Sequence, residues 1–480
     1  MEIIYNFYFG ISILLSLVTA GHALLHKQTP SSALGWIAVC LIFPFAGALL
    51  YFLFGINRVE TRARKLESKS QSFSAHTQHN YEEAAAAVSL VASELRLPRS
   101  YAQIARISDK VTRLPLVDGN RVDLLPGGET AYPEMLESIE QAEHYVFLTT
   151  YIFEANHSGR QFIDALTRAV RRGLDVRVLI DGVGEYYYFP RAGTLLKKNG
   201  VRVARFIPPR LFPPNLHINL RNHRKILIAD GQIGYTGGMN IGDRHLAHQI
   251  KNRSRVQDMH FRLKGPVVMQ MEQSFLEDWA FCTGDMSAPP PPTPIPSGPA
   301  ICRTITDGPN EDLNKLATII VGAISSSREQ VLIMTPYFLP SLEMISALQS
   351  AALRGIDVKV VLPALNNLPF IHWATNNMVR DLLYWGVRIY YQPPPFAHTK
   401  LFVIDQQYAQ IGSANLDPRS LRLNFELAVE IYEQHVARTI AGHIEHRIKH
   451  ASPLALSEIE QRPLIIKIRD ALMWLFSPYF

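Results

Sequence analysis

Two long runs of apolar residues open the chain. No formally charged residue occurs in residues 3–25 or in residues 33–56. A helix needs about 20 apolar residues to cross the hydrocarbon core of a bilayer, and each run exceeds that length. Only a short segment that contains Pro30 separates the two runs. The pattern therefore predicts a transmembrane helical hairpin over residues 1–57, with helices at about 3–25 and 33–56.

A cleaved signal peptide is the alternative interpretation of the first run, because residues 20–23 resemble a small-residue cleavage site. A signal peptide begins with basic residues, however, whereas this chain begins with Glu2 and a second apolar run follows the first at once. By the positive-inside rule, the basic residues after the second run predict that both ends of the hairpin, and the rest of the chain, are cytoplasmic. These residues are Arg58, Arg62, Arg64, Lys65 and Lys69.

Beyond the hairpin the pattern changes twice. Residues 58–106 are basic at first and then rich in Ser, Gln, Ala and Glu, which predicts a juxtamembrane connector without chemistry. From residue 107 onward, short apolar strands alternate with amphipathic helices, as in an α/β fold. A Pro-rich linker at residues 289–299 divides this part into two nearly equal pieces, residues 107–288 and 300–480.

The two pieces repeat one another. Residues 169–178 match residues 351–360, and each segment ends a helix at a glycine and enters a strand. Residues 199–203 and 385–389 repeat the same order of helix end, glycine and strand. Duplication predicts two tandem α/β repeats related by pseudo-twofold symmetry, so a site between them would receive equivalent groups from each repeat.

Composition limits the classes of function. The net charge of +6 suits a partner with a negative surface, which nucleic acid and anionic lipid both supply. The hydrophobic fraction of 47% is high for a wholly soluble chain, and the two N-terminal runs account for the excess. The three cysteines, Cys40, Cys282 and Cys302, exclude a disulfide framework and do not have the spacing of a zinc site.

One long motif occurs once in each repeat and carries the candidate chemistry. Because alternate residues of a strand point to the same face, the histidine and lysine of each copy project together. A lone histidine in a strand is more often a satisfied core residue, but the same set at the same spacing in two repeats favours a site. The anchors are His223, Lys225, Asp230, Gly237 and Asn240 in the first repeat, and His398, Lys400, Asp405, Gly412 and Asn415 in the second.

Two imidazoles, two ammonium groups and two carboxamides that converge on one point suit a phosphate better than a carbonyl or a metal ion. Lysine and asparagine would stabilise the charge in place of a metal, so we expect no metal and no other cofactor. One histidine can attack phosphorus and form a covalent phosphohistidine. The other can protonate the leaving alkoxide and later accept a proton from the acceptor. The motif predicts a two-step exchange at a phosphodiester and leaves open which histidine attacks.

The doubled H-x-K-x4-D-x6-G-[GS]-x-N motif resembles the phospholipase D superfamily, from about residue 107 to the C-terminus. The resemblance implies a catalytic set in which both asparagines bind the phosphate and both aspartates have supporting roles. It also implies an acidic residue downstream in each repeat that orients a histidine, a place that Glu426 and Asp258 fit. Gly238 stands where the second repeat has Ser413, so a hydroxyl is not required in both repeats, and Ser413 is a supporting candidate. The implied catalytic residues are His223, Lys225, Asp230, His398, Lys400 and Asp405, with Asn240 and Asn415 at the phosphate.

Within the superfamily, the two N-terminal runs and residues 221–225, 237–243 and 335–338 resemble the bacterial cardiolipin synthases. The resemblance implies an enzyme of the bacterial inner membrane that condenses two phosphatidylglycerol molecules into cardiolipin and glycerol. Anionic phospholipids and the membrane are then its partners, and nucleic acid is not. A hydrolytic phospholipase D, a phosphodiester nuclease and a non-catalytic lipid-binding protein are the alternatives.

Several apolar segments could touch the bilayer. Loops at residues 185–189, 211–214 and 393–396 carry aromatic or apolar side chains, and residues 464–480 place apolar residues on one helical face. We expect these segments either to insert into the headgroup layer or to pack against the protein. The oligomeric state stays open at this point.

Overall fold

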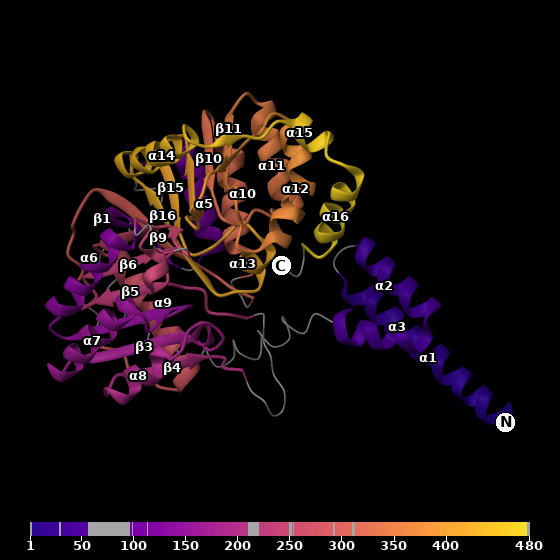
Figure 1. Cartoon of the computed structure of the whole chain (residues 1–480), viewed down its shortest axis with the longest axis horizontal. Coiled ribbons are helices and arrows are strands. Elements are labelled where there is room, and N and C mark those ends of the chain that lie inside the picture. The colour runs from indigo at the N-terminus through magenta and orange to yellow at the C-terminus, as the bar shows by residue number, and fades with distance from the viewer. Residues whose placement is uncertain are drawn as a thin grey trace. The chain divides into compact units, whose positions relative to one another are not determined.

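The computed structural model describes residues 2–27, 30–55, 97, 99–112, 114–209, 220–248, 252, 254–290, 293–309 and 313–477. The chain forms two compact units, Met1–Lys65 and Leu66–Phe480. Figure 1 shows the N-terminal unit in indigo and the two repeats of the larger unit in magenta and orange.

Helix α1 (Glu2–His26) is one continuous helix in the N-terminal unit. Its residues Phe7–His26 are long and apolar enough to cross a membrane, and no other helix among the described residues is. Its residues Ala20 and Ala23 pack against Cys40 and Tyr51, so the two apolar runs do fold back on one another. The hydroxyl of Tyr51 lies 2.7 Å from Nδ1 of His22.

The second apolar run is not one continuous helix. It divides into α2 (Pro30–Ile42), α3 (Pro44–Leu50) and a π-helical turn, η1 (Tyr51–Gly55). Phe43 leaves the helical conformation, with φ −121° and ψ 78°, because the ring of Pro44 disfavours a helical residue before it and offers no amide hydrogen. The sequence predicted a helix at 33–56, and the structure bends that helix at Phe43.

The larger unit is built on one sheet of 15 strands in the order β17-β12-β11-β10-β14-β15-β16-β9-β1-β8-β6-β5-β2-β3-β4. From the centre outward, the strands of the two repeats follow the same order, β1-β8-β6-β5-β2-β3-β4 and β9-β16-β15-β14-β10-β11-β12. The central strands β1 and β9 pair antiparallel, which joins the repeats through one sheet. The two predicted α/β repeats and their pseudo-twofold relation are confirmed.

The strands of the first repeat are β1 (Val117–Pro126), β2 (Tyr145–Thr150), β3 (Asp175–Asp181), β4 (Arg202–Phe206), β5 (Ile226–Ala229), β6 (Ile233–Gly237) and β8 (Met259–Lys264). Those of the second are β9 (Ala300–Asp307), β10 (Gln330–Met334), β11 (Asp357–Pro363), β12 (Arg388–Gln392), β14 (Leu401–Ile404), β15 (Tyr408–Gly412) and β16 (Glu426–Tyr432), with β17 (Ser452–Pro453) beyond β12. In each repeat three outer strands run parallel, and the next strand inward, β5 or β14, runs against them.

Helices cover both faces of the sheet. In the first repeat, Val146 and Leu148 of β2 belong to the core beneath α6 (Gly127–Gln141) and α7 (His157–Arg171). Phe147, between them, points to the opposite face and stacks on Phe275 of α9 (Val267–Thr283) at 4.9 Å. This alternation is why β2 is buried along its whole length.

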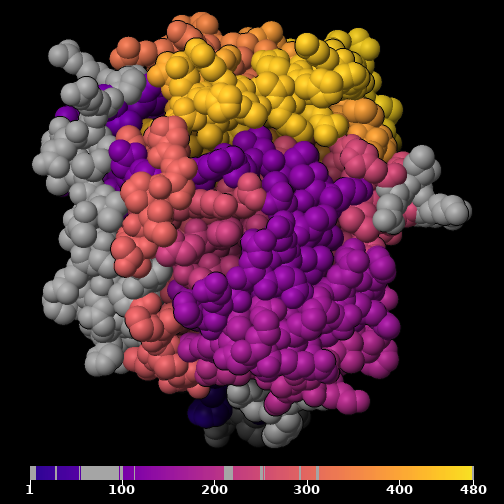
Figure 2. Space-filling view, turned by 90° about the vertical axis from the view of Figure 1, so that its left-hand side faces the viewer, coloured from indigo at the N-terminus to yellow at the C-terminus, as the bar shows by residue number. Residues whose placement is uncertain are grey.

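The second repeat has equivalent layers. Its helices are α10 (Lys315–Ser326), α11 (Leu342–Leu353), α12 (Pro369–Tyr384) and α14 (Gln434–Ile448), and α8 (Ala192–Lys198) is the counterpart of α12 in the first repeat. The short α13 (Pro418–Arg422) follows β15, and α15 (Leu456–Glu460) and α16 (Leu464–Leu475) pack on α12. The first repeat, purple, and the C-terminal residues of the second, yellow, adjoin in one body (Figure 2).

Helix α5 (Arg99–Val111) begins before the predicted start of the α/β part at residue 107. It packs against α10 and adds Tyr101, Ile104 and Ala105 to the core of the second repeat. These residues recur at the three- and four-residue spacing of a helix face, so the end of the predicted connector is part of the larger unit. The basic residues 58–69 lie outside the described residues.

Candidate active site

Each histidine of the doubled motif is held by an acid from the other repeat. His223 Nδ1 lies 3.0 Å from Oε1 and 3.1 Å from Oε2 of Glu426. His398 Nδ1 lies 2.8 Å from Oδ2 of Asp258. A carboxylate at Nδ1 fixes the tautomer with hydrogen on that nitrogen, which leaves the lone pair on Nε2, the nitrogen that can act as a nucleophile or base. The acids expected from the sequence are present, and they act across the repeats.

Backbone pairing explains this exchange. The amide of His223 donates to the carbonyl of Phe425 at 2.9 Å, next to Glu426. The amide of His398 donates to the carbonyl of Gln257 at 2.7 Å, next to Asp258. The second contact extends a short parallel ladder between β7 (Val256–Gln257) and β13 (Phe396–Ala397). The segment before each histidine is thus paired with the segment that leads into the opposite acid.

The lysines complete a compact cluster of cations. Lys225 Nζ donates to the carbonyl of His223, and Lys400 Nζ donates to the carbonyl of His398, both at 2.6 Å. Lys400 Nζ also lies 3.0 Å and 3.1 Å from the two ring nitrogens of His398. Both lysines are buried, at 2% and 6% exposure, so the motif brings its four basic groups to one enclosed place.

Burial shifts the pKa of every member of this cluster. Desolvation lowers the pKa of Lys225 to about 7 and that of Lys400 to about 8. Desolvation also lowers the pKa of His223, against the pull of Glu426, and lowers the pKa of His398 well below its ordinary value, with Lys400 and Lys225 contributing. A phosphate anion would favour the charged lysines, so the cluster is electrostatically suited to bind one.

The two acids are supported in different ways. Glu426 accepts a hydrogen bond from the hydroxyl of Ser413 at 2.5 Å, and that hydroxyl in turn accepts from the amide of Leu427 at 3.0 Å. In the first repeat the amide of Met259 donates directly to Asp258 at 2.8 Å. Ser413 is therefore a support for an acid.

Gly238 is required by the shorter acid. A Cβ atom on Gly238 would lie 2.4 Å from Oδ1 of Asp258, where the carboxylate occupies the space that the Ser413 hydroxyl fills in the second repeat. The space beside each acid is therefore filled differently in the two repeats: Gly238 leaves room for the carboxylate of Asp258, and Ser413 donates to that of Glu426. Burial raises the pKa of Asp258, whereas in Glu426 the effect of burial is outweighed by His223, Lys225 and Ser413 together, and the pKa is lowered.

The two asparagines follow β6 and β15, beside the lysines, because β6 pairs with β5 and β15 with β14. Asn240 Oδ1 accepts from the amide of Ile152 at 3.1 Å. Asn415 Nδ2 donates to the hydroxyl of Ser420 at 3.1 Å, and its Oδ1 is buried without a partner among the described residues. The structure brings both asparagines to the same end of the strands as the histidines.

The structure does not bring Asp230 and Asp405 to the site. Each lies at the far end of its strand, roughly 15 Å along the chain from the lysine by the rise of a strand. Asp230 accepts from the amides of Glu143, His144 and Tyr145 at 2.8 to 2.9 Å. Asp405 accepts from three amides, those of residues 328–330, at 2.8 to 3.0 Å. These carboxylates anchor the chain where it enters β2 and β10.

Two tyrosines at the site were not singled out from the sequence. The ring of Tyr151 lies 5.1 Å from that of His223, and Lys225 Nζ lies 5.7 Å from its centre. The ring of Tyr337 lies 6.4 Å from that of His398. Burial raises the pKa of both phenols. An aromatic residue just after the first parallel strand of each repeat was the available signal.

Exposed aromatic side chains lie near the first histidine. Tyr186, Tyr187 and Phe189 are 54%, 56% and 86% exposed, and the ring of Tyr187 lies 6.1 Å from that of Tyr151. Of the other two loops expected to be apolar, Phe396 packs 5.9 Å from His398, and residues 211–214 lie outside the described part of the chain.

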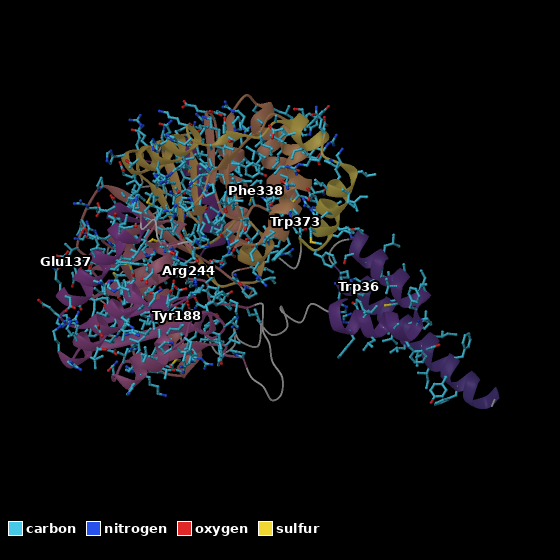
Figure 3. All side chains as sticks on the ribbon, viewed as in Figure 1. Trp36, Glu137, Tyr188, Arg244, Phe338 and Trp373 are labelled. Carbon is cyan, nitrogen blue, oxygen red and sulfur yellow. The ribbon has the colours of Figure 1, made fainter. Side chains whose placement is uncertain are left out.

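The C-terminal helix α16 also has an apolar face that points to solvent. Leu464, Ile465, Ile468, Leu472 and Leu475 are all exposed, whereas Met473 packs with the cluster that contains Tyr337. Arg469 lies over the ring of Trp373 of α12 at 4.5 Å, a residue labelled in Figure 3. One side of α16 is therefore fixed to α12, and its other side stays free.

Comparison with known proteins places these features in a family. The family described as "Cardiolipin synthase, PLD-like domain" matches residues 135–279 and 320–448, and "Phospholipase_D-nuclease N-terminal" matches residues 14–55. The chain is 31% identical over 460 residues to a cardiolipin synthase of Geobacillus kaustophilus, covering 95% of this chain and 90% of that one. It is 29% identical over 490 residues to the major cardiolipin synthase ClsA of Bacillus subtilis, covering 99% of both. Among solved structures, phosphatidylserine synthase of Haemophilus influenzae has the same fold, with a TM-score of 0.61 at 14% identity, covering 78% of this chain and 100% of that one.

Proposed function

This chain belongs to the family of cardiolipin synthases with a phospholipase D-like domain, and on that basis we propose that it transfers a phosphatidyl group between two phosphatidylglycerol molecules through a phosphohistidine. The observation that carries the proposal is the crossed pairing of His223 with Glu426 and of His398 with Asp258. With the hydrogen on Nδ1, both imidazoles carry their lone pair on Nε2, beside two buried lysines, and Lys400 Nζ lies 3.1 Å from Nε2 of His398.

In the first step, Nε2 of one histidine attacks the phosphorus of the donor lipid. The bond from phosphorus to the glycerol oxygen breaks, and the other histidine, which enters this step as an imidazolium, gives its Nε2 proton to that oxygen. In the second step, the hydroxyl of the acceptor lipid gives its proton to the second histidine and attacks phosphorus. The phosphorus–nitrogen bond then breaks, so the products are cardiolipin and glycerol and the enzyme regains its starting state.

The environment of the histidines supports these roles. A lowered pKa keeps an imidazole neutral at neutral pH, so the attacking nitrogen has its lone pair available. The carboxylate at Nδ1 stabilises the imidazolium that forms when the other histidine takes a proton. Lys225, Lys400 and the two asparagines are proposed to hold the non-bridging oxygens, where charge increases in the transition state.

We also propose that the N-terminal unit anchors the enzyme in the bacterial inner membrane with both apolar runs, and that the catalytic unit is cytoplasmic. Helix α1 is long and apolar enough for this role. The charge asymmetry around the two runs supports the orientation. Such an anchor would confine the site to lipids in the plane of the bilayer, which favours a lipid over nucleic acid as the substrate.

The test uses the purified full-length protein with labelled phosphatidylglycerol in vesicles. We expect cardiolipin and glycerol as products, and we expect His223→Ala and His398→Ala each to lower turnover by about 10⁴-fold or more, because the two imidazoles act as one unit. His435→Ala, which changes an exposed histidine of α14, is the matched control. Mass spectrometry of the protein quenched during turnover should find a phosphatidyl group on His223 or His398 and so identify the nucleophile.

Two results would contradict the proposal. Substantial turnover in either site variant would exclude a mechanism that needs both imidazoles. Release of phosphatidic acid without cardiolipin would assign the protein to hydrolytic phospholipases, in which water is the acceptor.

A further inference from the structure

An arginine follows the motif asparagine by four residues in both repeats, Arg244 after Asn240 and Arg419 after Asn415. The backbone around the two arginines is equivalent. Phe153 forms a parallel bridge with Ile241, and Phe338 forms the same bridge with Leu416. The two arginines can therefore be compared position by position.

Their ion pairs differ. Arg244 forms an ion pair with Glu154, the residue after Phe153. The equivalent residue after Phe338 is Leu339, which is buried and apolar. Within the part of the chain that the structure describes, the Arg419 side chain forms no ion pair, and its Nε is buried without a hydrogen-bond partner. The repeats therefore share the arginine but differ at the neighbouring position, which is Glu154 beside Arg244 and Leu339 beside Arg419.

Arg419 lies near the two tyrosines that pack on the histidines. Its guanidinium acts electrostatically on the hydroxyls of Tyr151 and Tyr337 and offsets part of the rise in the pKa of each phenol. Tyr151 packs on His223 and Tyr337 packs on His398. A guanidinium that forms no ion pair among the described residues thus lies beside the site, close to the line that divides the repeats, with Asp417 as an acid that acts on it without direct contact. The doubled motif does not include this arginine.

Condensation of two phospholipids brings two phosphodiesters to the site. One reacts and needs the histidines, lysines and asparagines. The other belongs to the acceptor lipid, stays intact, and lies three carbons from the hydroxyl that attacks. Leaving that anion in an enclosed site without a partner would be costly, and a guanidinium binds a phosphate with two parallel hydrogen bonds.

We propose that Arg419 binds the intact phosphodiester of the acceptor lipid and so selects a phospholipid over water or a neutral alcohol as the acceptor. The inference rests on the proposed function, because it assumes that a phosphatidyl group is already on the enzyme. It assigns Arg419 to the second half of the reaction and leaves the first half to the doubled motif.

The experiment compares two acceptors in one assay. Full-length wild-type protein and Arg419→Gln receive labelled phosphatidylglycerol in vesicles with ethanol added, so that cardiolipin and phosphatidylethanol form in competition. We expect Arg419→Gln to lower the rate of cardiolipin formation about 10- to 100-fold, the range for a lost hydrogen-bonded charge pair, and to leave phosphatidylethanol formation within about threefold. Arg422→Gln, an exposed arginine on the same helix α13, is the matched control and should change neither product.

A second variant reverses the natural difference between the repeats. Leu339→Glu places beside Arg419 the acid that Glu154 supplies to Arg244, so it should also suppress cardiolipin selectively. Leu339→Gln has nearly the same shape without the charge and should suppress it less. Because Leu339 is buried, phosphatidylethanol formation in the same tube reports whether each variant has folded.

The outcomes separate this inference from the proposed function. An equal loss of both products in Arg419→Gln would place Arg419 at the reacting phosphate and overturn the inference, and unchanged cardiolipin formation would overturn it as well. Wild-type protein that forms phosphatidylethanol but no cardiolipin would instead overturn the proposed function.

Discussion

A methyl group added at Gly238 should disable the histidine of the opposite repeat. The Cβ of Gly238→Ala would lie 2.4 Å from Oδ1 and 2.7 Å from Oδ2 of Asp258, whereas ordinary contacts begin near 3.4 Å. The carboxylate must therefore move by about 1 Å, the difference between 3.4 Å and 2.4 Å. A shift of that size would stretch the 2.8 Å bond to His398 beyond hydrogen-bonding distance.

The expected loss of activity follows from this displacement. A misplacement of about 1 Å at a catalytic group costs roughly 10²-fold in rate, and complete loss of an orienting carboxylate costs about 10⁴-fold. Turnover of Gly238→Ala on phosphatidylglycerol vesicles should therefore fall by about 10² to 10⁴. Backbone strain should not add to the cost of the displaced carboxylate, because the φ of Gly238 lies outside the left-handed region.

The structure also specifies the rescue. The double variant Gly238→Ser, Asp258→Glu copies the pair that Ser413 and Glu426 form in the second repeat, with the new hydroxyl taking the amide of Met259 as Ser413 takes that of Leu427. It should regain much of the lost turnover. Gly442→Ala, in a helix with open space around the added methyl group, is the matched control.

The assay is the initial rate of cardiolipin formation, with circular dichroism to confirm that each variant is folded. Gly238→Ala with wild-type turnover would refute the argument that the position of the Asp258 carboxylate controls His398. If Gly238→Ala loses turnover but the double variant regains none, the two repeats use different acids for a reason other than the space at residue 238.

Three further predictions concern the lysines, the motif aspartates and the exposed aromatic loop. The pKa values of Lys225 and Lys400 are lowered to about 7 and about 8, so both lysines lose their charge as pH rises through this range. The value of kcat/KM should therefore fall on the alkaline side, and a profile that is flat from pH 7 to 10 would contradict this. Asp405→Ala should destabilise the protein by about 2 to 4 kcal/mol in chemical unfolding, because three amides lose their acceptor and the φ of residue 405 is 51°. Turnover of the folded variant should change by less than about tenfold, and a folded but inactive variant would restore a catalytic role for Asp405. The double variant Tyr186→Ser, Phe189→Ser should lower the rate on vesicles by roughly tenfold and leave the rate on a short-chain soluble lipid unchanged. The control Tyr384→Ser, at another exposed tyrosine, should change neither rate, and an equal loss on both substrates would show that the loop serves packing.

The duplicated sequence was sufficient to predict the sheet of two repeats and most of the candidate site. His223, Lys225, His398 and Lys400 could be predicted because period-two alternation decides which side chains share a face, whatever the fold around them. Glu426 and Asp258 were expected from the family resemblance as orienting acids. Spacing along one chain does not tell which histidine an acid reaches, and the crossing depends on the ladders at Phe425 and Gln257.

Other features depend on contacts between distant segments. The two tyrosines at the site are single aromatic residues after buried strands, where packing in the core is the commoner role. Asp230 and Asp405 belong to the same motif as the histidines, but each lies at the opposite end of the intervening strand. The bend at Phe43 did have a local signal in Pro44, which the uninterrupted run of apolar residues obscured.

The crossed carboxylates have a consequence for how such an enzyme can be divided. Either repeat expressed by itself would possess an imidazole with no orienting partner and an acid with nothing to orient, so neither fragment would retain even half of the reaction. Joining both in a single polypeptide replaces a concentration-dependent encounter with an intramolecular one, since the seam between β1 and β9 forms as the chain folds. Specific activity should accordingly be insensitive to dilution of the protein.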